Sequence, residues 1–232
     1  MTQLHKMPRP ATRLSPSLSR RRYIHGVAQS MLVLGAFAVG RGATAQGAPA
    51  TPAADGFTLS FPVGVPLPAG LTLQASGTRQ VLGEITGTFR NPRDAAQLLA
   101  GWGWQGNVYR SYAAAPGAGP STPVQLEISL HRFGTSTGAA YALSYFAHDR
   151  AVAIHHHEEM TGLLLPCAAM VLDNGSATQY LRGRNLLVRV TVIMRWPADT
   201  RASKAARLTA TSLAIAILEQ AGIGSPARNA FC

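Results

Sequence analysis

Three histidines followed by two glutamates, at positions 155–159, form the densest group of potential metal ligands in the sequence. Imidazole and carboxylate groups bind zinc and copper, and in an extended chain His155 and His157 point the same way. Three adjacent histidines cannot all converge on one ion, and the helical pattern H-E-x-x-H is absent because Thr161 stands four residues after His157. We expect a solvated loop and no cofactor here. A zinc or copper site formed by His155, His157 and Glu158, in a metal-binding or metal-trafficking protein, is the alternative.

A second group of residues suited to binding is aromatic. Segment 101–106 reads Gly-Trp-Gly-Trp-Gln-Gly and matches G-x-G-x-x-G, but it should follow a helix and enter a strand, which is the wrong context for a dinucleotide site. Flat rings flanked by glycines can stack on a sugar or another apolar ligand, or they can anchor a loop on the core. We predict a ligand site formed by Trp102, Trp104 and Tyr109 with the polar strand residues Glu127 and His131.

Cys167 and Cys232 are the two cysteines of the chain. In an oxidising compartment they could form a disulfide that pins the C-terminal tail to the domain. A buried Cys167 with a free terminal thiol is the equal alternative.

Cations recur at three-residue spacing at Arg201, Lys204 and Arg207, near the start of an expected helix. We expect a solvated helix face. A cationic patch for an anionic ligand, formed together with Arg182 and Arg189, is the alternative.

The sequence contains no C-x-x-C and no phosphate-binding glycine loop. We therefore expect a binding domain rather than an enzyme. A hydrolase with an unrecognised site is the third alternative, and it would need a serine or histidine beside an acid in a deep cleft.

The charge of the 232-residue chain is unevenly distributed. Its 21 basic and ten acidic residues give +11, but seven of the basic and none of the acidic residues lie within 1–45, so the remainder carries only +4. This excess does not support a nucleic-acid partner. The apolar run 26–39 is shorter than the roughly 18 to 20 residues of a membrane-spanning helix.

The N-terminal segment has the order of a secretory signal: a basic region, a short apolar run, then Ala43-Thr44-Ala45, after which we expect cleavage. Residues 19–25, Ser-Arg-Arg-Arg-Tyr-Ile-His, resemble the twin-arginine consensus S-R-R-x-F-L-K, with Arg20 and Arg21 as the paired arginines. The resemblance implies export of a folded protein by the twin-arginine translocase. The expected location is the periplasm or outside the cell, with no stable transmembrane anchor after cleavage and an unknown small ligand or envelope component as partner.

Several elements must position the candidate residues. Alternation predicts strands at 124–133, 177–182 and 186–194, the last two joined by a tight turn, and a further strand is expected at 80–89. Asn91-Pro92 should begin a helix that ends at Gly101, and further helices should begin near Thr135 and Asp199. The helix from Thr135 should end near position 150. In the last helix we expect Leu208, Ile215 and Leu218 to face inward, and 57–76 should be extended with little regular structure.

Together these elements predict an α+β fold, a mostly antiparallel sheet of about five strands with helices packed on one face. The polar face would stay uncovered and offer a binding surface. The expected organisation is a signal peptide at 1–45, a flexible linker at 46–56, a single domain at 57–224 and a C-terminal tail at 225–232.

Overall fold

The computed structural model describes residues 59–155, 164–165, 167–195 and 199–223, all within one compact unit of the chain. In chain order the elements are β1 (Leu71–Arg79), α2 (Leu82–Thr86), α3 (Pro92–Gly101), β2 (Trp104–Ala114), β3 (Gln125–Phe133), α4 (Ser136–His155), β4 (Leu164–Leu165), β5 (Ala168–Asp173), β6 (Ser176–Gly183), β7 (Leu186–Ile193) and α5 (Thr200–Gln220). In this part of the chain, no helix combines the length and apolarity needed to cross a membrane.

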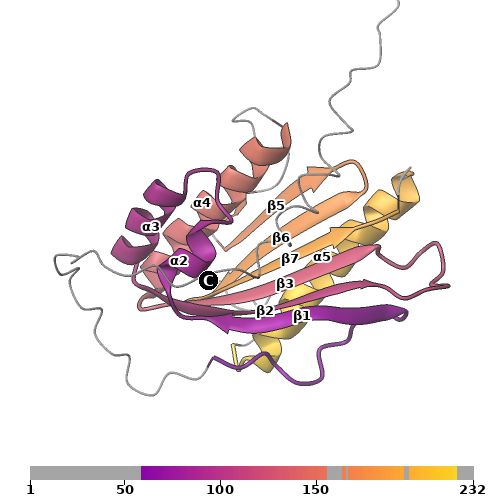
Figure 1. Ribbon diagram of the computed structural model, residues 1–232, viewed down its shortest axis with the longest axis horizontal. Coiled ribbons are helices and arrows are strands. Elements are labelled where there is room, and N and C mark those ends of the chain that lie inside the picture. Colours follow the sequence, from indigo (N-terminus) through magenta and orange to yellow (C-terminus); the bar gives the residue numbers. More distant parts are fainter. Residues whose placement is uncertain (1–58, 156–163, 166, 196–198, 224–232) are drawn as a thin grey trace, which may run out of the picture. The chain divides into compact units, whose positions relative to one another are not determined.

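The strands form one antiparallel sheet in the order β1-β2-β3-β7-β6-β5-β4 (Figure 1). The α+β class is therefore confirmed. The described part of the sheet has seven strands, one of them the two-residue β4, instead of about five.

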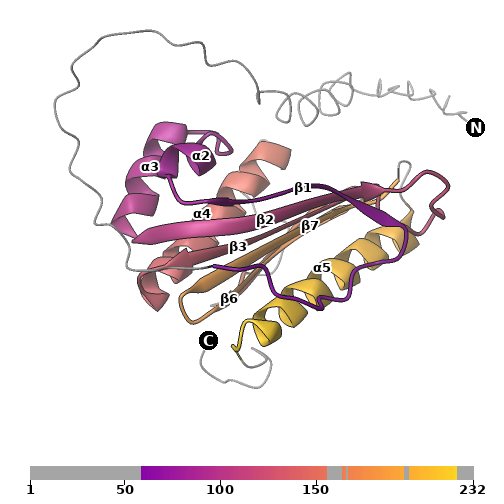
Figure 2. The ribbon, with the colours of Figure 1, turned by 60° about the horizontal axis from the view of Figure 1, so that its bottom comes forward.

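The helices lie on both faces of the sheet, which corrects the expectation of one covered face (Figure 2). Leu187 and Val188 are neighbours on β7 and point to opposite sides, yet both are 0% exposed. Val188 packs in a core with the inward residues of α5, and Leu187 in a second core with Phe133, Tyr180 and the buried residues of α4. We call these two sides of the sheet the α5 face and the α4 face. Because the α4 face carries apolar side chains of its own, a second layer of helices on that face is favourable, since it removes them from water.

The β6–β7 hairpin has the predicted tight turn. Gly183 pairs with Leu186, which leaves Arg184 and Asn185 as the two-residue turn, and Arg184 takes the left-handed conformation with φ of 52°. Leu181 then shares the α5 face with Val188, while Tyr180 and Arg189 share the other.

The predicted helix starts are confirmed. Asn91 accepts a hydrogen bond from the Asp94 amide, Thr135 Oγ1 accepts one from Gly138, and Asp199 accepts one from Ala202. The helix from Thr135 is longer than expected, because α4 runs to His155.

Two local predictions are wrong. Segment 80–89 holds the short helix α2 instead of a strand, because the Glu84 carboxylate accepts hydrogen bonds from the Gln80 and Val81 amides and Ile85 is buried. The first strand is β1, which begins inside the segment that was expected to lack regular structure.

In α5 the expected inward Leu208 is 59% exposed. The buried positions are the predicted Leu218 and five others: Ala206, Ala210, Leu213, Ala214 and Ile217. Their spacing fixes the helix phase and turns Leu208 to the solvent.

Candidate ligand-binding face

Four of the five predicted ligand residues share the α4 face: Trp104 and Tyr109 from β2, and Glu127 and His131 from β3. The pairing of the strands sets their places in cross-strand rows. One row runs Arg79, Asn107, His131 and Leu187 across β1, β2, β3 and β7. The next row runs Gly77, Tyr109, Ser129, Arg189 and Tyr180. Residues far apart in the sequence thus form one polar surface in the middle of the sheet.

His131 is held on three sides at the centre of this surface and is 3% exposed. The Trp104 indole N–H donates to His131 Nδ1 at 3.4 Å, Ser129 Oγ lies 3.0 Å from Nε2, and the Phe146 ring stands edge-on at 5.1 Å between ring centroids. Burial lowers the pKa of His131 well below its usual value, and the charges of Arg189 and Arg79 lower it further. His131 is therefore neutral at pH 7.

The Ser129–His131 pair is wrongly set for nucleophilic catalysis. An indole nitrogen can only donate, so Nδ1 must accept and the neutral ring carries its proton on Nε2. Nε2–H then donates to the Ser129 oxygen, whereas a general base would have to accept the serine proton at that atom. This geometry favours a structural role for the pair.

Asn107, which the sequence analysis missed, is the residue of this face that stands out. Its side chain is 1% exposed, and among the described residues neither Nδ2 nor Oδ1 has a hydrogen-bond partner. Buried polar side chains are normally paired. The available signal was the alternation of Asn107, Tyr109 and Ser111 along β2, which places three polar groups on one side of the strand.

Tyr109 lies beneath a cation. The Arg79 guanidinium is 3.9 Å from the Tyr109 ring centroid, and the ring lies across Gly77, where a Cβ would come within 2.9 Å of the tyrosine oxygen. Glycine at position 77 is therefore needed for the close approach of the Tyr109 ring. Burial lowers the pKa of Arg79, mainly because the charged form loses solvation.

Glu127 and Arg189 are the accessible part of the polar surface. Glu127 Oε2 lies 3.5 Å from Arg189 Nη2, with side-chain exposures of 30% and 33%. Glu127 Oε1 also accepts a 2.7 Å hydrogen bond from Gln125 Nε2. An ion pair as exposed as this one contributes little stability.

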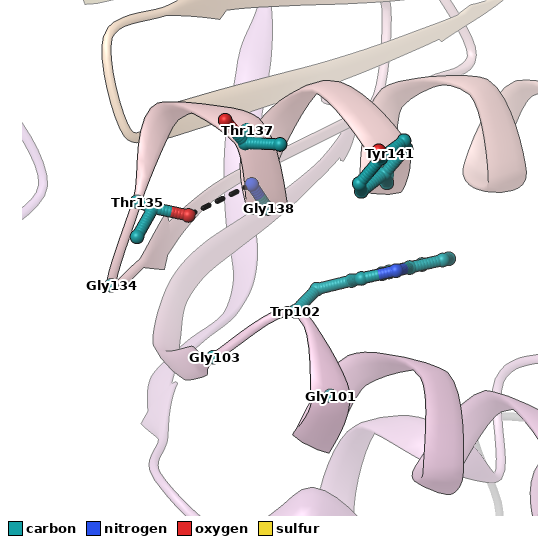
Figure 3. A pocket seen from close by; sticks show the side chains of 8 residues that line it. All are labelled: Gly101, Trp102, Gly103, Gly134, Thr135, Thr137, Gly138 and Tyr141. Atoms are coloured by element: carbon teal, nitrogen blue, oxygen red, sulfur yellow. Dashed lines mark hydrogen bonds between the residues drawn. The ribbon is translucent and has the colours of Figure 1, made fainter.

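Trp102, the fifth predicted residue, does not join the other four. It caps the end of α3 and lines a separate pocket of about 220 Å³ against the start of α4 (Figure 3). The Trp102 and Tyr141 rings lie on the two sides of this pocket, with centroids 6.1 Å apart. Three glycines and two threonines complete the lining together with Gly138: Gly101, Gly103, Gly134, Thr135 and Thr137. A Cβ at Gly138 would collide with the Trp102 carbonyl oxygen, so this glycine lets the two helices meet.

The remaining candidates lie largely outside the described residues. This holds for His157 and Glu158, for the side chain of His155, and for Arg20 and Arg21. Over the described ranges, no group of three histidine, cysteine or acidic side chains is placed to hold a metal ion.

Cys167 is a buried, disulfide-bonded cysteine, and Arg182 Nη2 lies 3.6 Å from its sulfur. Cys232 lies outside the described residues, so the pairing of the two stays a prediction.

The alternative cationic patch is not formed. Arg201, Lys204 and Arg207 are exposed on α5, whereas Arg182 and Arg189 lie on the α4 face of the sheet. The last helix thus has the solvated cationic side that was expected.

Comparison with known proteins does not identify a family. No protein-family pattern matches the chain, and no curated protein matches it. The chain is similar to a solved structure, the extracellular domain of PknH from Mycobacterium tuberculosis, with 12% identity and a TM-score of 0.38 over 62% of this chain and 85% of that one. A likeness this distant carries no argument about function.

Proposed function

We propose that this chain is an exported, non-enzymatic domain that binds a small polar ligand on its α4 face. The observation that carries the proposal is Asn107, a buried amide whose donor and acceptor are both unpaired among the described residues. Leaving such a group unpaired costs about 1–3 kcal/mol. A ligand that offers one acceptor and one donor would supply the missing partners.

The surroundings of Asn107 suit a small ligand. Tyr109, Glu127 and Arg189 are partly exposed on the same face and offer a ring face and two charged groups. Arg79 is paired with Asn107 across the strands and lies over Tyr109. The ligand would reach Asn107 by displacing this long, flexible side chain from the ring.

A binding role fits the arrangement better than catalysis. The serine–histidine pair on this face holds its proton on the wrong nitrogen for a general base.

The proposed place of action is the periplasm or outside the cell. The support is the resemblance of residues 19–25 to a twin-arginine signal, with the translocase as the partner during export. A net charge of +11 that falls to +4 after position 45 agrees with a basic leader and a domain of ordinary charge.

The test is a screen of small polar fragments against the exported protein, read from amide proton–nitrogen NMR spectra. We expect fragments that shift the signals of Asn107, Tyr109 and Glu127 while the α5 signals stay in place. The same fragments should lose their effect in Asn107→Leu and keep it in Asn174→Leu, which changes an exposed turn asparagine. A screen in which no fragment shifts the α4-face signals would refute the proposal.

A further inference from the structure

We infer that the ligand of the α4 face carries an oxyanion, a carboxylate or a phosphate, which the guanidinium groups of Arg79 and Arg189 bind. This inference rests on the proposed function and narrows it to a chemical class. It follows from the unpaired hydrogen-bond donors of the face, the placement of the two arginines and the hydrogen-bond pairing of the nearby acids.

Unpaired donors outnumber unpaired acceptors on this face. The buried nitrogens Asn107 Nδ2, Arg150 Nε and Arg189 Nε have no hydrogen-bond partner among the described residues, and Asn107 Oδ1 is the one acceptor in the same state. Arg150 stands on α4, the helix packed on this face, and its charge, like that of Arg189, acts on the buried hydroxyl of Tyr180. A ligand that completes the site must therefore bring mainly acceptors.

Arg79 on β1 and Arg189 on β7 stand in adjacent cross-strand rows of the α4 face, with β2 and β3 between them. Each lowers the pKa of His131 between them, and the charge of Arg189 also lowers the pKa of Arg79. Like charges on one partly buried face are unfavourable, and an anion that contacts both guanidiniums would relieve this repulsion. The planar fork of each guanidinium matches the oxygens of a carboxylate or phosphate.

The acids near these cations are already occupied or weakly paired. Glu84 accepts from two backbone amides at the start of α2, and Asp149 accepts from the Arg90 amide. Glu127 contacts Arg189 at 3.5 Å, beyond the usual range of a charge-assisted hydrogen bond, while Gln125 holds its other oxygen at 2.7 Å. A ligand oxyanion could therefore replace Glu127 on Arg189 at little cost.

The experiment compares two probes of nearly equal shape on the exported protein. N-acetylglycine carries a carboxylate beside an amide that both donates and accepts, and N-acetylglycinamide lacks the charge. Calorimetry and NMR shifts should show the acid binding at least about tenfold tighter than the amide. A third titration, with inorganic phosphate, shows whether the site prefers a phosphate.

Variants then test which arginines bind the carboxylate of the probe. Arg189→Met and Arg79→Met should each weaken N-acetylglycine by about tenfold and change N-acetylglycinamide by less than about twofold. Glu127→Gln should strengthen acid binding because it removes the competing carboxylate. Arg207→Met, on the exposed side of α5, is the matched control and should change neither probe.

The outcomes separate the inference from the proposed function. Equal binding of acid and amide on the α4 face would overturn the inference and leave the proposed function standing. An Arg207→Met loss as large as that of Arg189→Met would overturn it too, since the effect would then reflect general charge. No shift of the α4 face with the acid or with phosphate would also overturn it, and the fragment screen decides the proposed function separately.

Discussion

Replacing Asn107 with leucine should make the free protein more stable, although it changes a buried residue. The two side chains branch at the same atom, but leucine has no polar atoms to leave unpaired. Removing an unpaired buried amide recovers about 1–3 kcal/mol. The bulkier methyl groups offset part of this gain because they overpack the site. We expect a net gain of about 1–2 kcal/mol in the free energy of unfolding.

Thr178→Val is the control, because Thr178 lies on the same face and is also 1% exposed. Its Oγ1 lies 3.2 Å from that of Thr191, so valine would leave a buried hydroxyl unpaired. We expect this variant to lose about 1–2 kcal/mol. Urea unfolding followed by circular dichroism measures both, provided that the slope of the free energy against urea is unchanged. If Asn107→Leu were destabilised as Thr178→Val is, Asn107 would have partners in the free protein and the reasoning for the site would be refuted.

Three further predictions concern the core, the surface and export. Burial and the charges of two arginines depress the pKa of His131 in the folded protein. Below about pH 6.5 the unfolded chain therefore binds a proton at this histidine that the folded protein does not bind. The free energy of unfolding is thus highest above that pH and falls as the pH decreases. Urea unfolding between about pH 7.5 and pH 5 should show this loss of stability in wild type and in His148→Gln but not in His131→Gln. Leu218→Ala should cost about 2–5 kcal/mol because Leu218 is fully buried under the sheet, whereas Leu208→Ala should change the unfolding free energy by less than about 0.5 kcal/mol; equal losses would contradict the assigned phase of α5. Replacing Arg20 and Arg21 together by lysine should keep the protein in the cytoplasm, measured by cell fractionation, and unchanged export would rule out the twin-arginine route.

Local signals predicted much of the fold because they act within a few residues. A cap such as Asn91 or Asp199 fixes a helix start by a hydrogen bond to an amide three positions on. The alternation along β3 and β7 set their faces before any partner strand was known. The prediction of a strand at 80–89 was wrong for the opposite reason, since the buried contacts of Ile85 that favour a helix come from distant parts of the chain.

By itself, the sequence determined the basic N-terminal segment, the α+β class and the shared face of Glu127 and His131, which follows from the two-residue period of a strand. Tertiary structure alone decided that Trp102 stands apart from Trp104, because a glycine between them at φ of 69° turns the chain. It also decided that a second helical layer covers part of the polar face, and that Asn107 is buried beside Arg79 without a partner among the described residues. Pairing between strands sets these neighbours, and no local pattern of residues encodes a distance between strands.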